Sequence, residues 1–160
     1  MYRIPRAVHF MNLAVEHAKR STCARLNVGC LVSYSKDIVT LTHNGPPRGQ
    51  PHCTGRMCPG PGGTCERSTH AEMNALLKIQ ELLPTSFSLD LFVTHSPCPT
   101  CAWEIVSSRV FRRVFYQTEF RDANPLDILA KSLEVYKITP AGYITQFPTG
   151  DFIDPESLYA

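Results

Sequence analysis

The sequence predicts one α/β domain over residues 1–160, built as three layers with helices on both faces of a mixed five-stranded sheet. Three observations predict this class. A length of 160 residues fits one domain. Hydrophobic residues make up 43% and charged residues 19% of the chain, which is typical of a globular protein with a sizeable core. Finally, two adjacent apolar strands are followed by alternating helical and strand-like segments.

The first elements are a helix and a hairpin. Residues from about 5 to 20 place Val8, Met11, Val15 and Ala18 at helical spacing. Residues 28–34 and 37–43 are rich in β-branched and apolar side chains, and they flank Ser35 and Lys36. This pattern predicts two strands joined by a tight turn.

The rest of the pattern alternates between helices and strands. The expected helices are 69–83, 99–109 and 126–133, and the expected strands are 91–95, 110–116 and 135–138. The recognisable motifs end at about residue 138. Residues 139–160 contain Pro140, Pro148 and Pro155, and no element is assigned to them.

The composition excludes several classes of protein. Sixteen Lys and Arg against fourteen Asp and Glu give a net charge of +2, which predicts no nucleic-acid partner. No run approaches the roughly 18 apolar residues of a membrane span, and the N-terminus lacks the apolar run of a secretory signal. We therefore expect a soluble cytoplasmic protein (host cytoplasm, if virally encoded), in which seven cysteines indicate metal or thiol chemistry rather than disulfides.

Two short motifs carry the chemistry, and each precedes a predicted helix. The first holds His70, and the second holds Cys98 and Cys101, whose spacing at a helix start lets both sulfurs bind one ion. One imidazole and two thiolates predict a zinc site with a fourth position left for water, and zinc lowers the pKa of such a water to roughly 7.

Glu72 lies two residues after His70 and does not share its helix face, so it is a poor second ligand. It can instead accept a proton from the water and pass it to a leaving group. Alone, each motif is ambiguous, since Cys-x-x-Cys also occurs in redox pairs and structural zinc sites. Together, His-x-Glu and Pro-Cys-x-x-Cys form the signature of zinc nucleobase deaminases.

The sequence resembles the zinc-dependent cytidine and deoxycytidylate deaminase superfamily, and within it the dCMP deaminases of bacteria and bacteriophages. Four stretches carry the resemblance, together with Val114-Phe115-Tyr116: residues 21–29, residues 44–53 with Asn-Gly-Pro-Pro-Arg-Gly and His-Cys, residues 65–75, and residues 94–101. The resemblance spans roughly residues 5–138. It implies the cytidine deaminase-like fold and the deamination of dCMP to dUMP and ammonia, which would supply dTMP synthesis.

The resemblance also assigns roles to residues. It implies that His70, Cys98 and Cys101 hold zinc and that Glu72 carries the proton. The substrate would be bound by the Ala71 amide, the Ser96 carbonyl, Asn44, Arg25, Tyr116 and Asn74. Three of these have equally simple alternatives: Arg25 as a solvated surface residue, Tyr116 as a core aromatic, and Asn74 as part of a polar helix face.

Some family members are hexamers that dCTP activates and dTTP inhibits, with magnesium on the triphosphate. The resemblance places that regulation at Gly45, Arg48 and Gly49. It also implies a second, structural zinc held by Cys23, Cys53, Cys58 and Cys65, with His52 as the rival ligand. Cys30 would then be a small buried side chain.

Other functions stay open from the sequence. A related deaminase could act on cytosine, cytidine, deoxycytidine, dCTP, a pterin-like base or tRNA adenosine. A zinc-stabilised binding module would not need Glu72. A thiol oxidoreductase that uses Cys98 and Cys101 would keep its activity when zinc is chelated, whereas a deaminase would lose it.

Overall fold

A computed structural model describes residues 2–54, 65–82, 88–121 and 124–160. Its centre is one mixed sheet in the order β2-β1-β3-β4-β5-β6-β7. The strands are β1 (Gly29–Tyr34), β2 (Asp37–His43), β3 (Leu89–His95), β4 (Phe111–Thr118), β5 (Glu134–Ile138), β6 (Ile144–Phe147) and β7 (Phe152–Ile153). The neighbours β3, β4 and β5 run parallel, and the remaining pairs are antiparallel.

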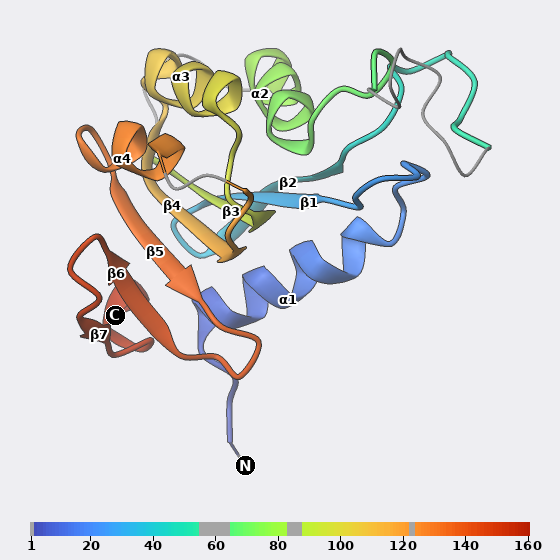
Figure 1. The fold of residues 1–160 in the computed structure, drawn as a ribbon. Helices are drawn as coiled ribbons and strands as arrows, with labels where there is room; N and C mark the ends of the chain where they lie inside the picture. The colour runs from blue at the N-terminus through green and yellow to red at the C-terminus, as the bar shows by residue number, and fades with distance from the viewer. Residues whose placement is uncertain (1, 55–64, 83–87, 122–123) are drawn as a thin grey trace.

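The helices cover both faces of this sheet, as predicted (Figure 1). One face carries α2 (Ala71–Leu82), α3 (Pro99–Ser108) and α4 (Asn124–Ala130), and the other carries α1 (Arg6–Ala18). The predicted helices and strands before residue 139 are all present, with ends shifted by up to three residues. No helix in the described part of the chain is long and apolar enough to cross a membrane.

Strand alternation explains why the sheet needs two covering layers. Cys30 and Val32 point into the cluster under α2 and α3, whereas Leu31 between them packs toward α1. Cys30 is fully buried, which confirms the role expected for it. On the α1 side, the Phe92 and Phe115 rings stack with centroids 4.4 Å apart.

The buried side of α1 differs slightly from the predicted one. Ala7, Met11, Ala14 and Ala18 are buried, whereas Val8 and Val15 are only partly so. Gly29 of β1 allows this close approach, because a Cβ there would lie 1.9 Å from the Ala14 carbonyl oxygen.

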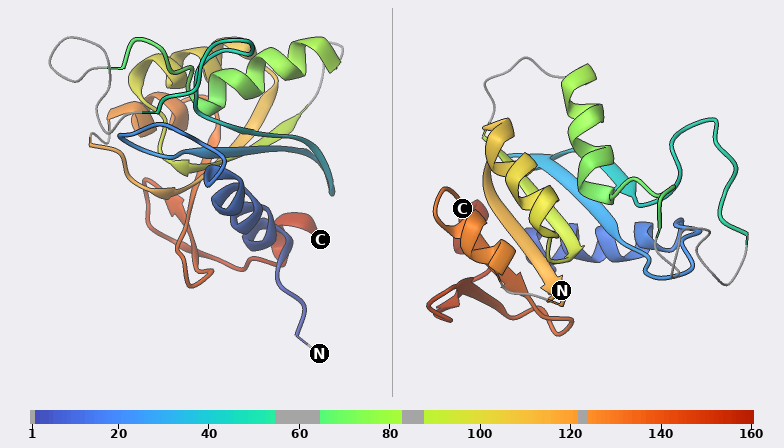
Figure 2. Two further views of the ribbon diagram at one scale, coloured as in Figure 1. Left: turned by 90° about the vertical axis from the view of Figure 1, so that its right-hand side faces the viewer. Right: turned by 45° about the horizontal axis from the view of Figure 1, so that its top comes forward.

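The prediction of five strands was wrong, because the C-terminal segment adds two more. After β5 the chain turns at Gly142, whose φ is +89°, and β6 pairs antiparallel with β5. A second turn at Gly150 brings β7 onto β6. Pro140 and Pro148 lie between the strands and Pro155 follows β7, so the prolines delimit these short strands rather than prevent them. Figure 2 shows this addition on the β5 side of the sheet.

Hydrogen bonds around the buried carboxylate of Asp90 hold residues 157–159 on the sheet. Tyr159, in the short 3₁₀ helix η2 (Ser157–Tyr159), donates a 2.6 Å hydrogen bond to the buried carboxylate of Asp90. Arg113 donates to the same carboxylate at 2.6 and 2.9 Å, and to the Leu158 carbonyl at 2.9 Å. Residues 157–159 are therefore part of the layer that covers the α1 face.

Candidate active site

The metal-ligating side chains predicted from sequence lie together. His70 immediately precedes α2, Cys98 is the N-cap residue of α3, and Cys101 lies in the first turn of α3. His70 Nδ1 is 3.3 Å from Cys101 Sγ and 3.5 Å from Cys98 Sγ, and all three ligand atoms lie within 4.8 Å of one another. A tetrahedral zinc ion separates such N and S ligands by about 3.6 Å, so this group fits zinc.

The electrostatics of the three side chains also suit a cation. A hydrogen bond from Cys101, together with one from His70, lowers the pKa of Cys98 to about 4. The pKa of the Cys101 thiol lies well above its ordinary value, because the thiol donates this hydrogen bond to Cys98 and because it is buried. Negative charge is therefore concentrated on the Cys98 sulfur, at the positive end of α3.

Glu72 is the buried carboxylate of the site. It lies in the first turn of α2 with only 4% of its surface exposed. Burial raises its pKa to about 7, because desolvation disfavours the charged form. A carboxyl group with this pKa can both accept and donate a proton near neutral pH, which is what a proton shuttle requires.

A cavity of about 560 Å³ joins these groups. Its lining includes His70, Glu72 and Cys98, and also four of the residues expected to bind substrate: Arg25, Asn44, Ala71 and Ser96. The volume is in the range of pockets that enclose small molecules.

Asn44 braces the wall of this cavity. Its Oδ1 accepts from the Val28 amide and its Nδ2 donates to the Leu26 carbonyl, both at 2.8 Å. An amide oxygen can accept twice and an amide nitrogen can donate twice, so Asn44 retains capacity for a ligand. A contact between Asn44 and a sugar stays a prediction.

Two other expected substrate residues do not line this cavity. Tyr116 is 1% exposed in the core, with its hydroxyl 3.5 Å from Glu119 Oε1, which favours the alternative role as a core aromatic. Asn74 donates a 2.9 Å hydrogen bond to the His43 carbonyl and ties α2 to the end of β2. Asn74 thus holds the backbone residue that precedes Asn44.

The residues expected to bind a regulatory nucleotide lie in the segment after β2. The Gly45 amide is already used, since Gly45 and Thr69 exchange two backbone hydrogen bonds of 3.1 and 2.8 Å. This bridge positions the residue before His70. Arg48 and Gly49 are exposed, and Gly49 has a φ of +86°.

The residues expected to hold a second zinc are only partly described. Cys58 lies outside the described residues, while Cys23 and Cys65 line the cavity and Cys53 is partly buried. Among residues 2–54, 65–82, 88–121 and 124–160, the only group of three or more ligand atoms close enough for a metal is His70, Cys98 and Cys101.

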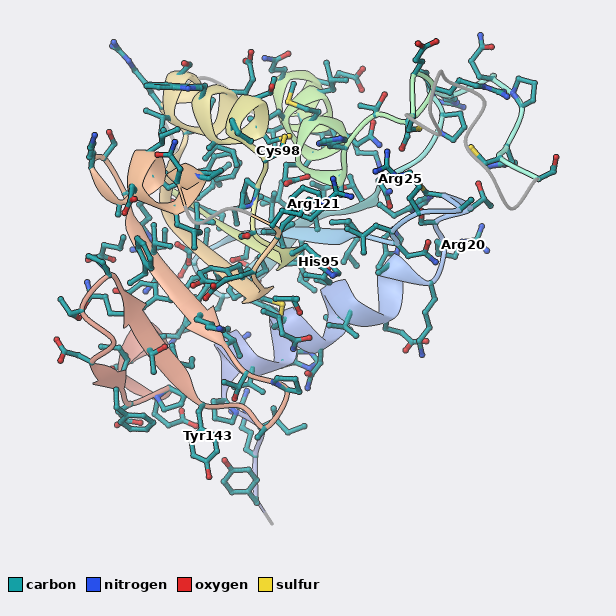
Figure 3. All side chains as sticks on the ribbon, in the orientation of Figure 1. Arg20, Arg25, His95, Cys98, Arg121 and Tyr143 are labelled. Atoms are coloured by element: carbon teal, nitrogen blue, oxygen red, sulfur yellow. The ribbon has the colours of Figure 1, made fainter. Side chains whose placement is uncertain are left out.

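Several residues that line the cavity were not expected from the sequence, and four of them follow the ends of β3 and β4 or lie at those ends: His95, Glu119, Phe120 and Arg121. His95 and Arg121 lie near Cys98 and Arg25 in Figure 3. Burial lowers the pKa of His95, so its imidazole is neutral near pH 7. The Phe120 amide donates a 2.7 Å hydrogen bond to Ser96 Oγ, which holds this segment against the end of β3.

Comparison with known proteins identifies the family. Residues 5–118 match the family described as the cytidine and deoxycytidylate deaminase zinc-binding region. The chain belongs to this deaminase family. The matched region contains His70, Cys98 and Cys101, and the α/β fold agrees with deaminase structures. A dCMP deaminase from the cyanophage S-TIM5, solved in complex with dCMP and dUMP, is 31% identical with a TM-score of 0.75. That match covers 86% of this chain and 99% of the cyanophage chain.

Two curated relatives are longer proteins. ComE operon protein 2 of Bacillus subtilis is 32% identical over 121 residues, which cover 76% of this deaminase chain and 64% of the relative. The deoxycytidylate deaminase of Schizosaccharomyces pombe is 28% identical over 129 residues, which cover 76% of this chain and 40% of the relative. The match therefore spans less than two thirds of each relative.

Proposed function

We propose that this protein catalyses the hydrolytic deamination of dCMP to dUMP and ammonia, with zinc held by His70, Cys98 and Cys101. The observation that carries the proposal is the buried carboxyl group of Glu72, which lines the same cavity as the ligands His70 and Cys98, with Cys101 grouped beside those two. The similarity to a cyanophage enzyme solved with dCMP and dUMP supports the choice of substrate.

Zinc at this site would supply a water of lowered pKa as the nucleophile. Glu72 accepts a proton from the attacking water and delivers it to N3 of the pyrimidine, while the water oxygen bonds to C4. Glu72 then moves the second water proton to the amino group, which leaves as ammonia when the C4–N4 bond breaks. A carboxyl pKa of about 7 suits both transfers.

The cavity walls would orient the substrate. The Ala71 amide and the Ser96 carbonyl face the pyrimidine edge in this proposal, and Asn44 contacts the sugar. Arg25 and Arg121 come from separate segments to line the same cavity, and both are labelled in Figure 3. Two guanidinium groups match the charge and geometry of a 5′-phosphate.

The test is a spectrophotometric assay of dCMP deamination by the zinc-loaded protein, beside Glu72→Gln. Gln keeps the size of Glu72 and its place in the cavity but cannot carry the proton, so we expect kcat to fall by at least about 100-fold with zinc content unchanged. If Glu72→Gln is as active as the parent protein, Glu72 is not the shuttle.

The same assay also tests whether dCMP is the substrate. If the zinc-loaded protein does not turn over dCMP, this substrate is wrong, and cytidine, deoxycytidine, dCTP and RNA are assayed in turn. A protein that holds zinc but deaminates none of these, nor cytosine or a pterin-like base, is a binding module.

Regulation is a further part of the proposal. We propose that dCTP activates and dTTP inhibits the enzyme, with Mg²⁺ on the triphosphate, and that the protein is a hexamer. The resemblance of residues 45–49 to the region that the family uses for this regulation supports the proposal. Since the Gly45 amide is bonded to Thr69, phosphate contacts there would fall to Arg48 and the remaining backbone.

We also propose that residues 1–160 form one domain, supported by the single sheet that runs from β2 to β7. A second zinc on Cys23, Cys53, Cys58 and Cys65 is supported by the family resemblance. Metal analysis of Cys58→Ser tests it: one zinc per chain should be lost, and an unchanged zinc content and melting temperature would exclude it.

A further inference from the structure

A second cavity, of about 460 Å³, lies where the start of α1 meets the β1–β2 turn and the C-terminal segment. Its lining shares no residue with the cavity that holds Glu72. Four of the lining side chains are basic or can become so: Arg3, Arg6, His9 and Lys36. They come from the N-terminal segment, α1 and the turn, three parts of the chain that only the fold brings together.

Charge is concentrated in this cavity. Arg3, Arg6 and Lys36 against Glu156, its only acidic lining residue, give a formal charge of +2 with His9 neutral. This equals the net charge of the whole 160-residue chain. The ion pairs found among the described residues involve Lys19, Arg112, Arg113 and Lys137, and none includes a cation of this cavity.

Arg6 is the cation that the fold holds in place, while Arg3 and Lys36 are exposed lining residues. Arg6 donates a 3.0 Å hydrogen bond to the Lys36 carbonyl, and its guanidinium lies 5.9 Å from the centre of the Phe10 ring. A guanidinium has five N–H donors, so Arg6 retains others for a ligand. Tyr159 forms a fixed wall, because its hydroxyl is bonded to Asp90 and its ring stacks on Arg113 at 4.7 Å.

The helix adds to the same field. The positive end of a helix normally carries acidic side chains. The first turn of α1 has no acidic residue, its N-cap residue Pro5 makes no side-chain capping bond, and Arg6 stands there instead. Cations at the positive end of a helix repel it, and a bound anion would relieve that repulsion.

We propose that this cavity is a second anion site, which binds the polyphosphate chain of a small molecule such as a nucleoside triphosphate. Three unpaired cations around one cavity match an ion with several negative charges better than a single carboxylate. The volume is large enough for such a ligand. The site is separate from the catalytic cavity and does not depend on the reaction proposed above.

The test is calorimetric titration of the full-length, zinc-loaded protein with inorganic pyrophosphate, with and without saturating dUMP to occupy the catalytic cavity. The variant is Arg3→Glu/Lys36→Glu, which turns the lining charge from +2 to −2. The matched control is Lys131→Glu, a reversal at an exposed position outside both cavities. Circular dichroism and zinc content verify that each variant is folded.

We expect pyrophosphate binding that persists with dUMP present, that weakens at least about tenfold in the double variant and that is unchanged in Lys131→Glu. Equal affinity in the double variant, or equal loss in Lys131→Glu, overturns the proposal. Titration with ATP distinguishes the source of the phosphates. Inorganic tripolyphosphate, which has the same three phosphates, is the reference: equal affinity shows that the phosphate chain alone is bound, and tighter binding of ATP shows that the nucleoside is also recognised. The comparison of the double variant with Lys131→Glu does not require dCMP turnover, so its outcome is independent of the proposed reaction.

Discussion

Neutralising Asp90 is the sharpest test of how the C-terminal segment is held on the sheet. Its carboxylate is fully buried and accepts hydrogen bonds from Arg112, Arg113 and Tyr159. Asp90→Asn leaves the Arg113 guanidinium buried without its counter-charge, and breaking a buried pair in this way costs about 3–5 kcal/mol. For a chain of this length, about 1 kcal/mol corresponds to about 2–4 °C, so we expect the melting temperature to fall by about 10 °C.

Tyr159→Phe is the graded companion of that change. This substitution removes one hydrogen-bond donor, while the Asp90 carboxylate keeps its bonds from both arginines. The free energy of unfolding should therefore fall by about 1.5 kcal/mol, the low end for a hydrogen bond to a charged group. This corresponds to a melting temperature lower by about 4 °C. Asp151→Asn is the control, because Asp151 is an exposed carboxylate in the β6–β7 turn.

The pH dependence gives a second, independent readout of Asp90. Burial alone would raise its pKa, but the hydrogen bonds from Arg113, Arg112 and Tyr159 outweigh burial and lower the pKa below its ordinary value. A carboxylate with a lowered pKa in the folded state stabilises the protein above its unfolded-state pKa of about 3.9, and this stabilisation is lost as the pH falls below that value.

Thermal unfolding followed by circular dichroism at pH 7, 5, 4 and 3 measures both effects. The difference between the parent protein and Asp90→Asn should be large at pH 7 and 5 and should narrow below about pH 4. The reasoning is refuted if Asp90→Asn melts within about 1 °C of the Asp151→Asn control at pH 7.

Three further predictions concern the metal, the phosphate and the packing of α1. Removing zinc with a chelator should abolish deamination and lower the melting temperature, and added zinc should restore both; activity that survives chelation would indicate thiol chemistry instead. Arg25→Ala and Arg121→Ala should each raise KM for dCMP about tenfold and leave deoxycytidine turnover unchanged, whereas equal effects on both substrates would exclude a phosphate contact. Gly29→Ala should cost about 3 kcal/mol or more, because its Cβ would lie 1.9 Å from the Ala14 carbonyl oxygen. Chemical denaturation measures that loss against Gly45→Ala, whose added Cβ has 4.0 Å of space.

The sequence predicted the elements up to residue 138 because their patterns are local. The strand from Asp37 to His43 was predicted with the ends that the structure shows, since β-branched residues fill it and a polar turn precedes it. The strands after residue 138 were missed because Ile144–Phe147 and Phe152–Ile153 are short, and their stability comes from pairing with β5 and with each other. Pairing with a distant partner leaves no periodic signal in so short a run.

Within the site, the ligands were predictable because each belongs to a motif at the start of a helix. The buried state of Glu72 was not, since it depends on the layer that α2 forms over β1 and β2. The hydrogen bonds of Asn44 could not be predicted from the sequence either. Its residue type suggested a sugar contact, but its side-chain bonds to residues 26 and 28 could be seen only in the fold.

The missed cavity residues follow from the parallel pairing of β3 with β4. His95 stands opposite Thr118 in that register, and the Ser96 amide donates to the Thr118 carbonyl at 2.8 Å. Residues just beyond both carboxyl ends must therefore meet, and in open α/β sheets ligands bind at such ends. The predicted strand ended at residue 116, two residues short of the observed end, so Glu119, Phe120 and Arg121 received no attention. Only the observed end of β4 at Thr118 makes Glu119, Phe120 and Arg121 the next three residues, so Arg121 could be recognised as a site candidate only once the fold had fixed that end.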